Sequence, residues 1–525
     1  MLVRQGIVRF LEEMGVRHIF HLPGVHTLPL NASLGESNIK VIIGRHESAS
    51  AFMADGFSRA SGLPGVILVT PGPGVANVVS ACMEAHADDI PLIIIFIDVE
   101  RKDVEKGILH GVREPEAIFR TISKATFVVR RGQELAATLG EAFHLAVSAR
   151  PGPVVLSIPH GILEKEAPFA MAGGPERPKG PALDFKAMEV ALKGARRPVI
   201  IGGRGLVGKG LGPLLDRTCR EWGIPFLSST SGKGVLPEDR PHVFGNIVAR
   251  GTARAILDEA DLVIALGTRL RDVDSKRRGV KIKRLIHIDE DDRWLGKNYP
   301  LGLHVGGDVP GAAEMLLRLL DGTKSDWDME ALHRARQREL EDLGQENVGF
   351  RIVSLLRRVI PHDAVCVFDL NMIGYWAEYY FPVLGERTFL FPRGISPIFY
   401  AFPASLGAKL GKKEAPCLCV TGDGSFLPTA AELATMRKYD IPVVVLIYDN
   451  SSFGVLEDFM RSRHGARDAM GLLNPDFSAL AGSFGIKASR AESLGELERI
   501  FLNDIKWDEP YVVEFRYPLI DPPWA

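Results

Sequence analysis

The stretch GDGSFLPTAAELATMRKYDIPVVVLIYDN, residues 422–450, holds the features that decide the fold and the chemistry of this chain. Its Gly-Asp-Gly turn follows one apolar run, and Asp449 and Asn450 end the next apolar run. Two apolar runs separated by a helical segment predict neighbouring parallel strands, whose carboxyl ends meet at one edge of a sheet. Asn450 comes 27 positions after Asp423, so we expect the two side chains to lie together.

The residues of this stretch predict a site for a phosphate group and a cation. Glycines let backbone N–H groups approach a phosphate closely, and a carboxylate offers a hard oxygen to a divalent cation. We expect Asp423, Asn450 and the backbone carbonyl of Ser452 to share one magnesium ion, with diphosphate oxygens and water as its other ligands. A Gly-Asp-Gly turn alone is more often a tight connection, but its pairing with Asn450 favours the metal site.

Apolar runs of the same kind recur along the whole chain and predict its fold class. They include PGVILVT, PLIIIFI, GPVVLSI, ADLVIALG, AVCVFDL and PYVVEFRY. Helical patterns separate them, which is typical of α/β units whose parallel sheets are covered on both faces. All of these runs are far shorter than the ~20 residues of a membrane-spanning helix. We therefore expect an α/β protein with parallel sheets and no membrane association.

Two stretches interrupt this alternation and predict three domains. Residues 164–182 are rich in Pro, Gly and charge and read as a linker, and residues 321–346 are highly charged, with a surface helix inside. The expected domains are residues 1–165, 183–322 and 346–525.

The first and last domains also share a sequence pattern. DDIPLIIIFIDV (88–99) and YDIPVVVLIYDN (439–450) align at a spacing of 351 positions. Such a match can arise by chance because parallel strands resemble one another, but it favours two related α/β domains flanking a third. The central domain contains GGRGLVG (202–208), which fits the Gly-x-Gly-x-x-Gly pattern of a Rossmann-like, dinucleotide-binding turn. The next strand lacks the acidic residue that would hold a ribose, so NAD is not expected.

Composition excludes several classes of function. The chain has 63 basic and 65 acidic residues among 525, so no nucleic-acid partner is expected. Its five cysteines form no C-x-x-C pair, which argues for a reducing compartment and against structural zinc. The first residues, MLVRQGIVRFLEEMGV, read as an amphipathic helix and not as a signal peptide. We expect a cytoplasmic protein.

One acidic residue stands at the start of an otherwise apolar helix. RHESASAFMADGFSRASG (45–62) is rich in alanine and carries Met53 and Phe57, which predicts a buried helix with Glu47 at its mouth. A glutamate there is often a partner of the helix dipole or a capping acid. The alternative is a functional carboxyl.

Five segments together resemble the thiamine-diphosphate (ThDP) enzymes of the acetolactate synthase, pyruvate decarboxylase and benzaldehyde lyase group. They are IFHLPGVHTLPL (19–30), GRHESASAFMADGFSRASG (44–62), TPGPGVANVVS (70–80), PRGISPIFYAFPASLGAKLG (392–411) and the 422–450 stretch. The resemblance covers essentially the whole chain. It implies an N-terminal pyrimidine-binding domain, a Rossmann-like central domain and a C-terminal diphosphate-binding domain.

The resemblance also implies roles for single residues. Glu47 matches the catalytic glutamate that hydrogen-bonds the aminopyrimidine of ThDP, and Ile398 matches the apolar residue that supports the bent cofactor. The expected cofactor-binding residues are Pro23, Gly24, Asn77, Asn371, Ser396, Ile398, Gly422, Gly424, Ser425, Asn450, Ser452, Phe453 and Gly454. The resemblance further implies a homodimer, or a dimer of dimers, whose active sites lie at the subunit interface.

The substrate pocket departs from the relatives. Asp449 replaces the first residue of an Asn-Asn pair, and Met372 and Ile373 stand where acetolactate synthases have Gln-His. His26 matches a histidine of benzaldehyde lyases, and His110 is the only counterpart of a histidine pair in pyruvate decarboxylases. Both are candidate catalytic residues that shuttle protons, although either could instead be an ordinary surface histidine.

The expected function is a ThDP- and Mg²⁺-dependent enzyme that makes or breaks a carbon–carbon bond beside a carbonyl, acting on a 2-oxo acid or a 2-hydroxy ketone. Decarboxylation of a 2-oxo acid with carboligation, as in acetolactate synthases, is favoured. The alternatives are a lyase or simple decarboxylase, a flavin-linked oxidase, and a non-catalytic ThDP-binding subunit. Some relatives place FAD or ADP on the central domain; FAD stays open here and is not predicted.

Overall fold

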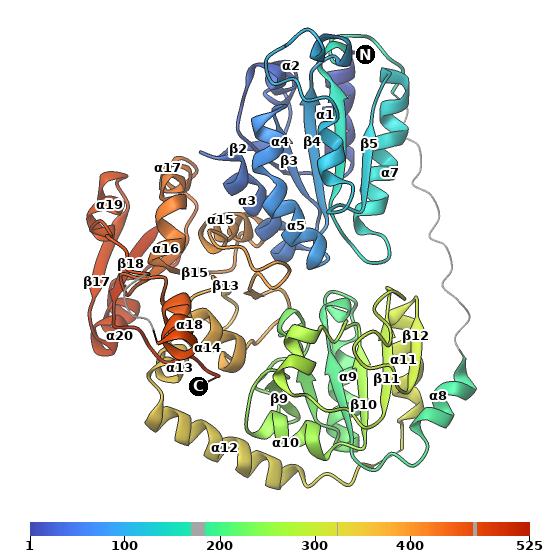
Figure 1. Ribbon diagram of the computed structural model, residues 1–525, viewed down its shortest axis with the longest axis vertical. Coiled ribbons are helices and arrows are strands. Elements are labelled where there is room, and N and C mark those ends of the chain that lie inside the picture. The colour runs from blue at the N-terminus through green and yellow to red at the C-terminus, as the bar shows by residue number, and fades with distance from the viewer. Residues whose placement is uncertain (170–183, 323, 466–469, 525) are drawn as a thin grey trace.

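The computed structural model describes residues 1–169, 184–322, 324–465 and 470–524. They form three six-stranded sheets in which all neighbouring strands are parallel (Figure 1). The expected α/β architecture with parallel sheets is confirmed. Of the predicted linker at 164–182, residues 170–182 lie outside the described residues. None of the described helices is long and apolar enough to cross a membrane.

The N-terminal sheet has the strand order β2-β1-β3-β4-β6-β5. Its strands are β1 (His18–His21), β2 (Lys40–Ile43), β3 (Gly65–Val69), β4 (Leu92–Asp98), β5 (Ala125–Val128) and β6 (Val154–Pro159). Its helices are α1 (Val3–Glu13), α2 (Leu28–Leu34), α3 (Glu47–Ser61), α4 (Pro73–Asn77), α5 (Val79–Ala87), α6 (Arg101–Val104) and α7 (Leu135–Val147). Because β3 and β4 are buried along their whole length, they read as continuous apolar runs.

The C-terminal sheet repeats this order as β14-β13-β15-β16-β18-β17. Its strands are β13 (Val365–Phe368), β14 (Phe389–Leu390), β15 (Cys417–Gly422), β16 (Val444–Asp449), β17 (Lys487–Ala491) and β18 (Tyr511–Arg516). Its helices are α13 (Val348–Val359), α14 (Met372–Tyr380), α15 (Ala401–Gly411), α16 (Asp423–Phe426), α17 (Leu433–Lys438), α18 (Gly454–His464), α19 (Phe477–Ser483) and α20 (Leu494–Asn503).

The sequence pattern shared by residues 88–99 and 439–450 adopts the same turn in both domains. Asp89 and Asp440 have left-handed backbone conformations, with φ of 60° and 46°. The next residue in each copy, Ile90 or Ile441, donates its N–H to a carbonyl five positions earlier, at Ala85 or Met436. The same turn therefore enters β4 and β16, and the two outer domains are related as the pattern predicted.

The central sheet has the order β12-β11-β10-β7-β8-β9, which is the arrangement of a Rossmann fold. Its strands are β7 (Pro198–Gly202), β8 (Phe226–Ser228), β9 (Val243–Asn246), β10 (Leu262–Leu266), β11 (Leu285–Asp289) and β12 (Leu303–Gly306). Its helices are α8 (Phe185–Leu192), α9 (Gly212–Trp222), α10 (Thr252–Glu259) and α11 (Val309–Leu319). The charged helix α12 (Met329–Glu346) has no buried residue and leads on to the C-terminal domain (Figure 1).

Helices α3 and α15 join the two outer domains by a close crossing. A Cβ on Gly56 would lie 1.9 Å from the carbonyl oxygen of Ala404, and a Cβ on Gly407 would lie 1.7 Å from that of Met53. Only glycine allows this backbone approach. Side chains from α3 and α15 share one hydrophobic core with strands of both outer sheets, so this contact joins the outer domains.

We expect Gly56→Ala and Gly407→Ala each to lower the free energy of unfolding by about 1–3 kcal/mol, because the added methyl overlaps a backbone oxygen. Gly495→Ala on α20 is the control, since no atom lies within 4 Å of a Cβ there. It should leave the stability unchanged or raise it slightly, because alanine favours helix. Thermal unfolding followed by circular dichroism tests this, and equal melting of all three variants would contradict the close crossing.

Candidate functional site

The carboxyl edge of the C-terminal sheet gathers two buried carboxylates. Asp423 begins α16 directly after β15, and Asp449 ends β16. The side-chain amide of Asn474 donates to both, at 2.8 Å to Asp423 Oδ2 and 2.9 Å to Asp449 Oδ1. Burial raises the pKa of Asp423 to about 6, and the nearby charge of Asp449 adds to this rise. Two carboxylates held together in this way favour a bound cation, because a cation offsets their mutual repulsion.

Two side-chain amide nitrogens at this edge have no hydrogen-bond partner among the described residues. They are the buried Nδ2 atoms of Asn371 and Asn450. Asn371 caps α14 by accepting from the N–H of Gly374 at 2.8 Å, and a Cβ on Gly422 would lie 4.0 Å from its Nδ2. Asn371 follows β13 and Gly422 ends β15, the two strands at the topological switch point of this sheet. Unpaired donors beside glycines fit an anionic ligand such as a diphosphate.

The loop after β16 turns back over the Gly-Asp-Gly turn. Ser451 has a left-handed backbone with φ of 53°, and its N–H donates to Asp449 Oδ1 at 3.0 Å. A Cβ on Gly424 would lie 2.6 Å from the Phe453 ring, so a larger residue there would have to displace that ring. Ser452 donates its hydroxyl to Glu457. The structure thus brings Ser452, Phe453 and Gly454, which begins α18, to the same edge as Asp423.

The segment that carries Ser396 and Ile398 is tied to this turn. Ser396 and Phe399 have left-handed backbones, with φ of 59° and 71°. The N–H of Phe399 donates to Ser425 Oγ at 2.7 Å, and Ser425 in turn donates to the buried Asp369. Burial raises the pKa of Asp369. The exposed side chain of Ile398 lies on a segment whose last residue is fixed to the turn after β15.

Glu47 is the first residue of α3 and lies at the carboxyl edge of the N-terminal sheet. It is 7 % exposed and accepts a hydrogen bond from Asn77 Nδ2 at 2.9 Å. A Cβ on Gly74 would lie 3.6 Å from its Oε1. An acid that only offsets a helix dipole has no need of burial or of a dedicated amide donor, so these contacts favour a functional carboxyl.

The early Pro-Gly loop packs beside this carboxyl. Pro23 is exposed and Gly24 is half-buried, and a Cβ on Gly24 would lie 2.3 Å from Thr70 Cγ2. Thr70 also faces Gly74, where a Cβ would lie 2.7 Å from its Oγ1. Thr70 therefore joins the loop to the segment that contacts Glu47.

Three histidines meet at the same edge, of which His26 and His110 were expected there. Their ring centroids are 5.5 Å apart, and the ring of His160 lies 5.9 Å from that of His26. Burial, with smaller effects of the two neighbouring imidazoles, lowers the pKa of His26. His26 is therefore neutral at pH 7 and can accept a proton.

His21 anchors the start of the Pro-Gly loop and has a structural role. It is fully buried, with Nδ1 bonded to the carbonyl of Leu68 at 2.6 Å. Its Nε2 lies 3.2 Å from both Thr27 Oγ1 and Asn31 Nδ2. Burial lowers the pKa of His21 to about 4, so the folded protein holds this imidazole neutral.

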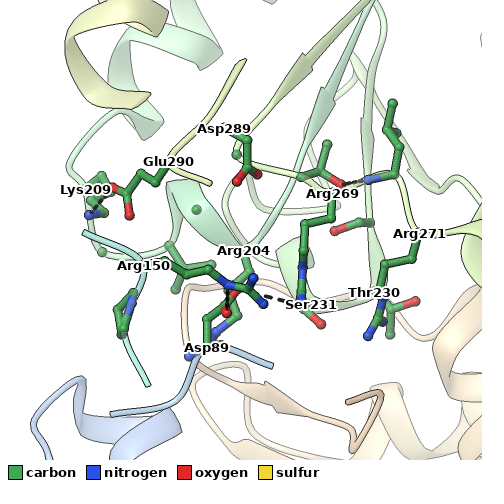
Figure 2. A pocket seen from close by; sticks show the side chains of 18 of the residues that line it. Asp89, Arg150, Arg204, Lys209, Thr230, Ser231, Arg269, Arg271, Asp289 and Glu290 are labelled. Atoms are coloured by element: carbon green, nitrogen blue, oxygen red, sulfur yellow. Dashed lines mark hydrogen bonds and ion pairs between the residues drawn. The ribbon is translucent and has the colours of Figure 1, made fainter. Parts of the chain in front are cut away.

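A second candidate site lies at the switch point of the central sheet, between β7 and β10. Figure 2 shows side chains that line this cavity. Its volume is about 500 Å³. Its glycines are tightly packed, with the N–H of Gly205 donating to the carbonyl of Gly267 at 2.8 Å. Asp289, at the end of β11, also lines the cavity. Its carboxylate comes from a different strand than the one after residues 202–208, where the acidic residue that would hold a ribose is missing. Burial raises the pKa of Asp289 to about 6.

Some of the cationic side chains around this cavity pair with a carboxylate, and others do not. Arg150 pairs with Asp89, and Lys209 pairs with Glu290 (Figure 2). Arg204 and Arg387 line the cavity without a carboxylate partner among the described residues. Burial lowers the pKa of Arg204 to about 10. Two guanidinium groups that have no carboxylate partner among the described residues favour an anionic ligand.

Models of known protein families match most of the chain. Three models of thiamine pyrophosphate (synonymous with thiamine diphosphate) enzymes match: the N-terminal TPP binding domain at residues 1–118, the central domain at 186–316 and the C-terminal TPP binding domain at 370–515.

Curated relatives match over nearly their whole length. A probable 2-ketoarginine decarboxylase of Pseudomonas aeruginosa is 34% identical over 510 residues, covering 94% of this chain and 90% of the relative. A probable acetolactate synthase large subunit of Methanocaldococcus jannaschii is 31% identical over 546 residues, covering 99% and 92%. The acetolactate synthase isozyme 3 large subunit of Escherichia coli is 28% identical over 517 residues, covering 94% and 90%.

The buried neutral state of His21 predicts acid lability. A histidine whose pKa falls from 6.5 to about 4 on folding contributes stability above pH 6.5 and loses it as the pH falls through 4. This shift corresponds to about 3 kcal/mol of free energy of unfolding. We expect His21→Gln to depend less steeply on pH than the wild type between pH 6.5 and 4. Thermal unfolding across this range measures the slopes, and identical slopes would contradict the assignment.

Proposed function

This chain belongs to the family of thiamine pyrophosphate enzymes, and we propose that it decarboxylates a 2-oxo acid and joins the product to a second carbonyl compound, as an acetolactate synthase does. The observation that carries the cofactor dependence is the edge of the C-terminal sheet, where Asp423 and the unpaired amide nitrogens of Asn371 and Asn450 lie beside a glycine-rich turn; the joining reaction is proposed from the relatives named as acetolactate synthases. This donor set fits Mg²⁺ and a diphosphate together.

We propose cofactor contacts from the family resemblance and, at the edge of the C-terminal sheet, from the chemistry of the groups gathered there. The Asp423 carboxylate, Asn450 and the Ser452 carbonyl would hold Mg²⁺, and Asn371 with the N–H groups around Gly422 and Gly424 would hold the diphosphate. Ser396, Ile398, Ser425, Phe453 and Gly454 would contact the rest of the cofactor from the C-terminal domain, and Pro23, Gly24 and Asn77 from the N-terminal domain. When bound, ThDP supplies a nucleophilic carbon that adds to a substrate carbonyl and accepts the electron pair released with CO₂.

The chain's own groups would bind, orient and transfer protons. Glu47 Oε1 or Oε2 would hold a proton against a ring nitrogen of the cofactor, and the bond from Asn77 Nδ2 fixes the orientation of that carboxyl. His26, neutral at pH 7, would accept a proton from a substrate hydroxyl and return it, with His110 beside its ring. His160 would complete the cluster.

The proposal leaves two points to experiment: which 2-oxo acid is the substrate, and whether a second carbonyl compound is joined to the product. Relatives with similar coverage are named as acetolactate synthases and as a 2-ketoarginine decarboxylase. Met372 and Ile373, which stand where acetolactate synthases have polar residues, support the alternative of a decarboxylase or a lyase without carboligation. A ThDP-binding subunit without activity is a further alternative, against which the buried Glu47–Asn77 pair argues.

A second candidate function is nucleotide binding in the central domain. The unpaired Arg204 and Arg387, the glycine contacts and Asp289 favour an anionic dinucleotide such as FAD, and with FAD bound a flavin-linked oxidase becomes the alternative reaction. Flavin absorbance near 450 nm in the purified protein, lost in Arg204→Gln, would support it; a colourless protein that does not bind added FAD would exclude it.

Product analysis tests the reaction. We expect wild-type protein with ThDP and Mg²⁺ to release CO₂ from pyruvate and to form acetolactate. Glu47→Gln should lower the rate by about 100-fold or more, because the amide cannot take up or release the proton. Aldehyde in place of acetolactate would favour a simple decarboxylase, and activity only on 2-ketoarginine would replace pyruvate as the substrate. An unchanged rate in Glu47→Gln would contradict its catalytic role.

We also propose a homodimer in which Glu47 of one subunit and Asp423 of the other serve one site. Apolar side chains exposed near the two candidate edges, such as Val25, Leu109 and Leu473, support a covered surface there.

Mixed dimers test this arrangement. Glu47→Gln and Asp423→Asn are each expected to be inactive, whereas a dimer with one subunit of each kind keeps one intact site. Unfolding and refolding the two variants together should restore about a quarter of the wild-type activity, since about half of the dimers are mixed and each has one of two sites. No recovery, with mixed dimers present by native mass spectrometry, would place both residues of a site in one chain.

A further inference from the structure

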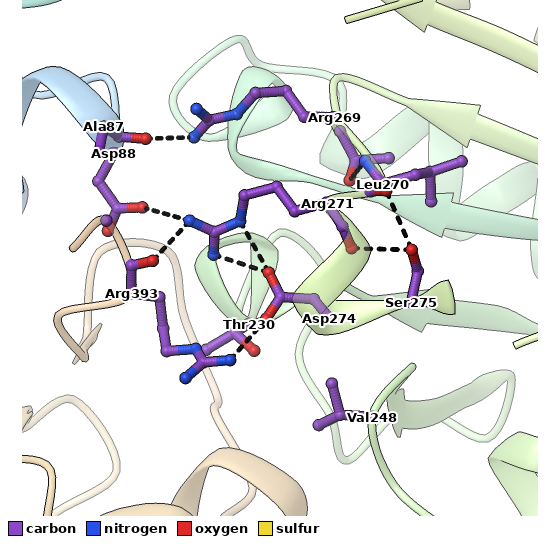
Figure 3. Close-up of polar contacts among 12 residues, drawn as sticks. Ala87, Asp88, Thr230, Val248, Arg269, Leu270, Arg271, Asp274, Ser275 and Arg393 are labelled. Atoms are coloured by element: carbon purple, nitrogen blue, oxygen red, sulfur yellow. Dashed lines mark hydrogen bonds and ion pairs between the residues drawn. The ribbon is translucent and has the colours of Figure 1, made fainter. Parts of the chain in front are cut away.

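The segment from Arg393 to Phe399 begins in a clamp built from all three domains. Arg271 of the central domain donates to the carbonyl of Arg393 at 2.6 Å and lies 3.5 Å from Asp88 (Figure 3). Arg393 donates to Asp274 at 2.6 Å and pairs with Glu378 of α14 at 3.1 Å. The central domain therefore holds both the backbone and the side chain of Arg393.

The N-terminal domain holds the next two residues through one carboxylate. Glu84 of α5 is fully buried. Its Oε1 accepts the N–H of Gly394 at 3.0 Å, and its Oε2 accepts the N–H of Ile395 at 2.7 Å. A Cβ on Gly394 would lie 2.6 Å from the Glu84 carbonyl oxygen, so only glycine lets the segment lie against α5.

The alternative is that Glu84 only neutralises the buried Arg59. Arg59 already has two closer carboxylates, with Nε 2.6 Å from Asp55 Oδ1 and Nη1 2.7 Å from Asp88 Oδ2. Its contact with Glu84 is longer, at 3.1 Å, whereas Glu84 lies 2.7 Å from the N–H of Ile395. A buried carboxylate is costly unless its oxygens are satisfied, and here backbone N–H groups take one bond at each oxygen. The segment is therefore a principal partner of Glu84.

The segment is fixed at its far end too. Phe399 is bonded to Ser425 in the Gly-Asp-Gly turn, and Ser396 and Ile398 lie between the two anchors. Helix α5 follows α4, whose last residue is Asn77, the donor to Glu47. Helix α4 thus orients the carboxyl of Glu47 through Asn77, and helix α5, which follows it, holds the segment of Ser396 and Ile398 through Glu84.

We propose that Glu84 is a positioning residue for the cofactor: it holds the 393–399 segment in the conformation that presents Ser396 and Ile398 to ThDP. This role rests on the proposed function. The two backbone bonds fix the start of a segment with two left-handed, non-glycine residues, a conformation that is costly without outside support. Loss of the bonds releases the segment and weakens cofactor binding, although Glu84 itself does not contact the cofactor.

Two measurements on the full chain test this role. Hydrogen–deuterium exchange of a peptide that begins at Phe391 or earlier and extends through Tyr400, without ThDP, reports the amides of Gly394 and Ile395 directly. Equilibrium dialysis with ThDP and Mg²⁺ reports cofactor affinity. Glu84→Gln should speed exchange at the amides of Gly394 and Ile395 and raise the Kd for ThDP by about tenfold or more. Gly394→Ala is a second variant, for use if Glu84→Gln does not fold, because it leaves Glu84 and Arg59 paired. It should also speed exchange in the segment and raise the Kd for ThDP.

Asp55→Asn is the matched control. It removes a carboxylate from Arg59 but keeps an oxygen for the Tyr400 hydroxyl, which lies 2.8 Å from Asp55 Oδ1. We expect wild-type exchange and ThDP affinity in this variant. Equal effects of Asp55→Asn and Glu84→Gln would overturn the role of Glu84, as would Glu84→Gln with wild-type ThDP affinity. Failure of the wild type to bind ThDP would instead overturn the proposed function itself.

Discussion

The close crossing of α3 and α15 is the constraint on which both candidate edges depend. Gly56 and Gly407 bring the two helix backbones into direct contact, and any larger residue would separate them. Glu47 begins α3, and the segment with Ser396 and Ile398 leads directly into α15. The crossing therefore sets where the N-terminal carboxyl and the C-terminal segment lie within one chain, before any cofactor or second subunit is considered.

Buried charge reinforces this crossing and extends it to the central domain. Arg59 of α3 is surrounded by Asp55, Glu84 and Asp88, and Asp88 also lies 3.5 Å from Arg271 of the central domain. Loss of Arg59 would leave these buried carboxylates without their shared cation, which costs about 3–5 kcal/mol. The central domain thus supports the segment that enters α15 and also walls a cavity whose unpaired arginines favour an anion.

Sequence patterns predicted the features of the fold and of the candidate site that depend only on the spacing of residues close together in the chain. Parallel strands, the Gly-Asp-Gly turn, Asn450 at the end of the next strand and Glu47 at a helix start all follow from short runs, and the structure places them at sheet edges. Asn474, Glu84, His160 and Asp289 were missed because each acts through a tertiary contact with no periodic signal. Asn474 is 51 positions from Asp423, and Glu84 is 310 positions from Gly394. The NPDF segment that carries Asn474 is a helix-capping pattern, which gives no sign of its contact with Asp423.

Titration calorimetry of ThDP into chelator-treated protein, with and without Mg²⁺, tests whether Asp423, Asn450 and Asn371 form one site for a cation and a diphosphate. We expect saturable binding of one ThDP per chain that requires Mg²⁺. We expect this binding to be lost in Asp423→Ala, with the fold retained by circular dichroism. Binding of equal strength without a divalent cation, or unchanged binding in Asp423→Ala, would contradict it.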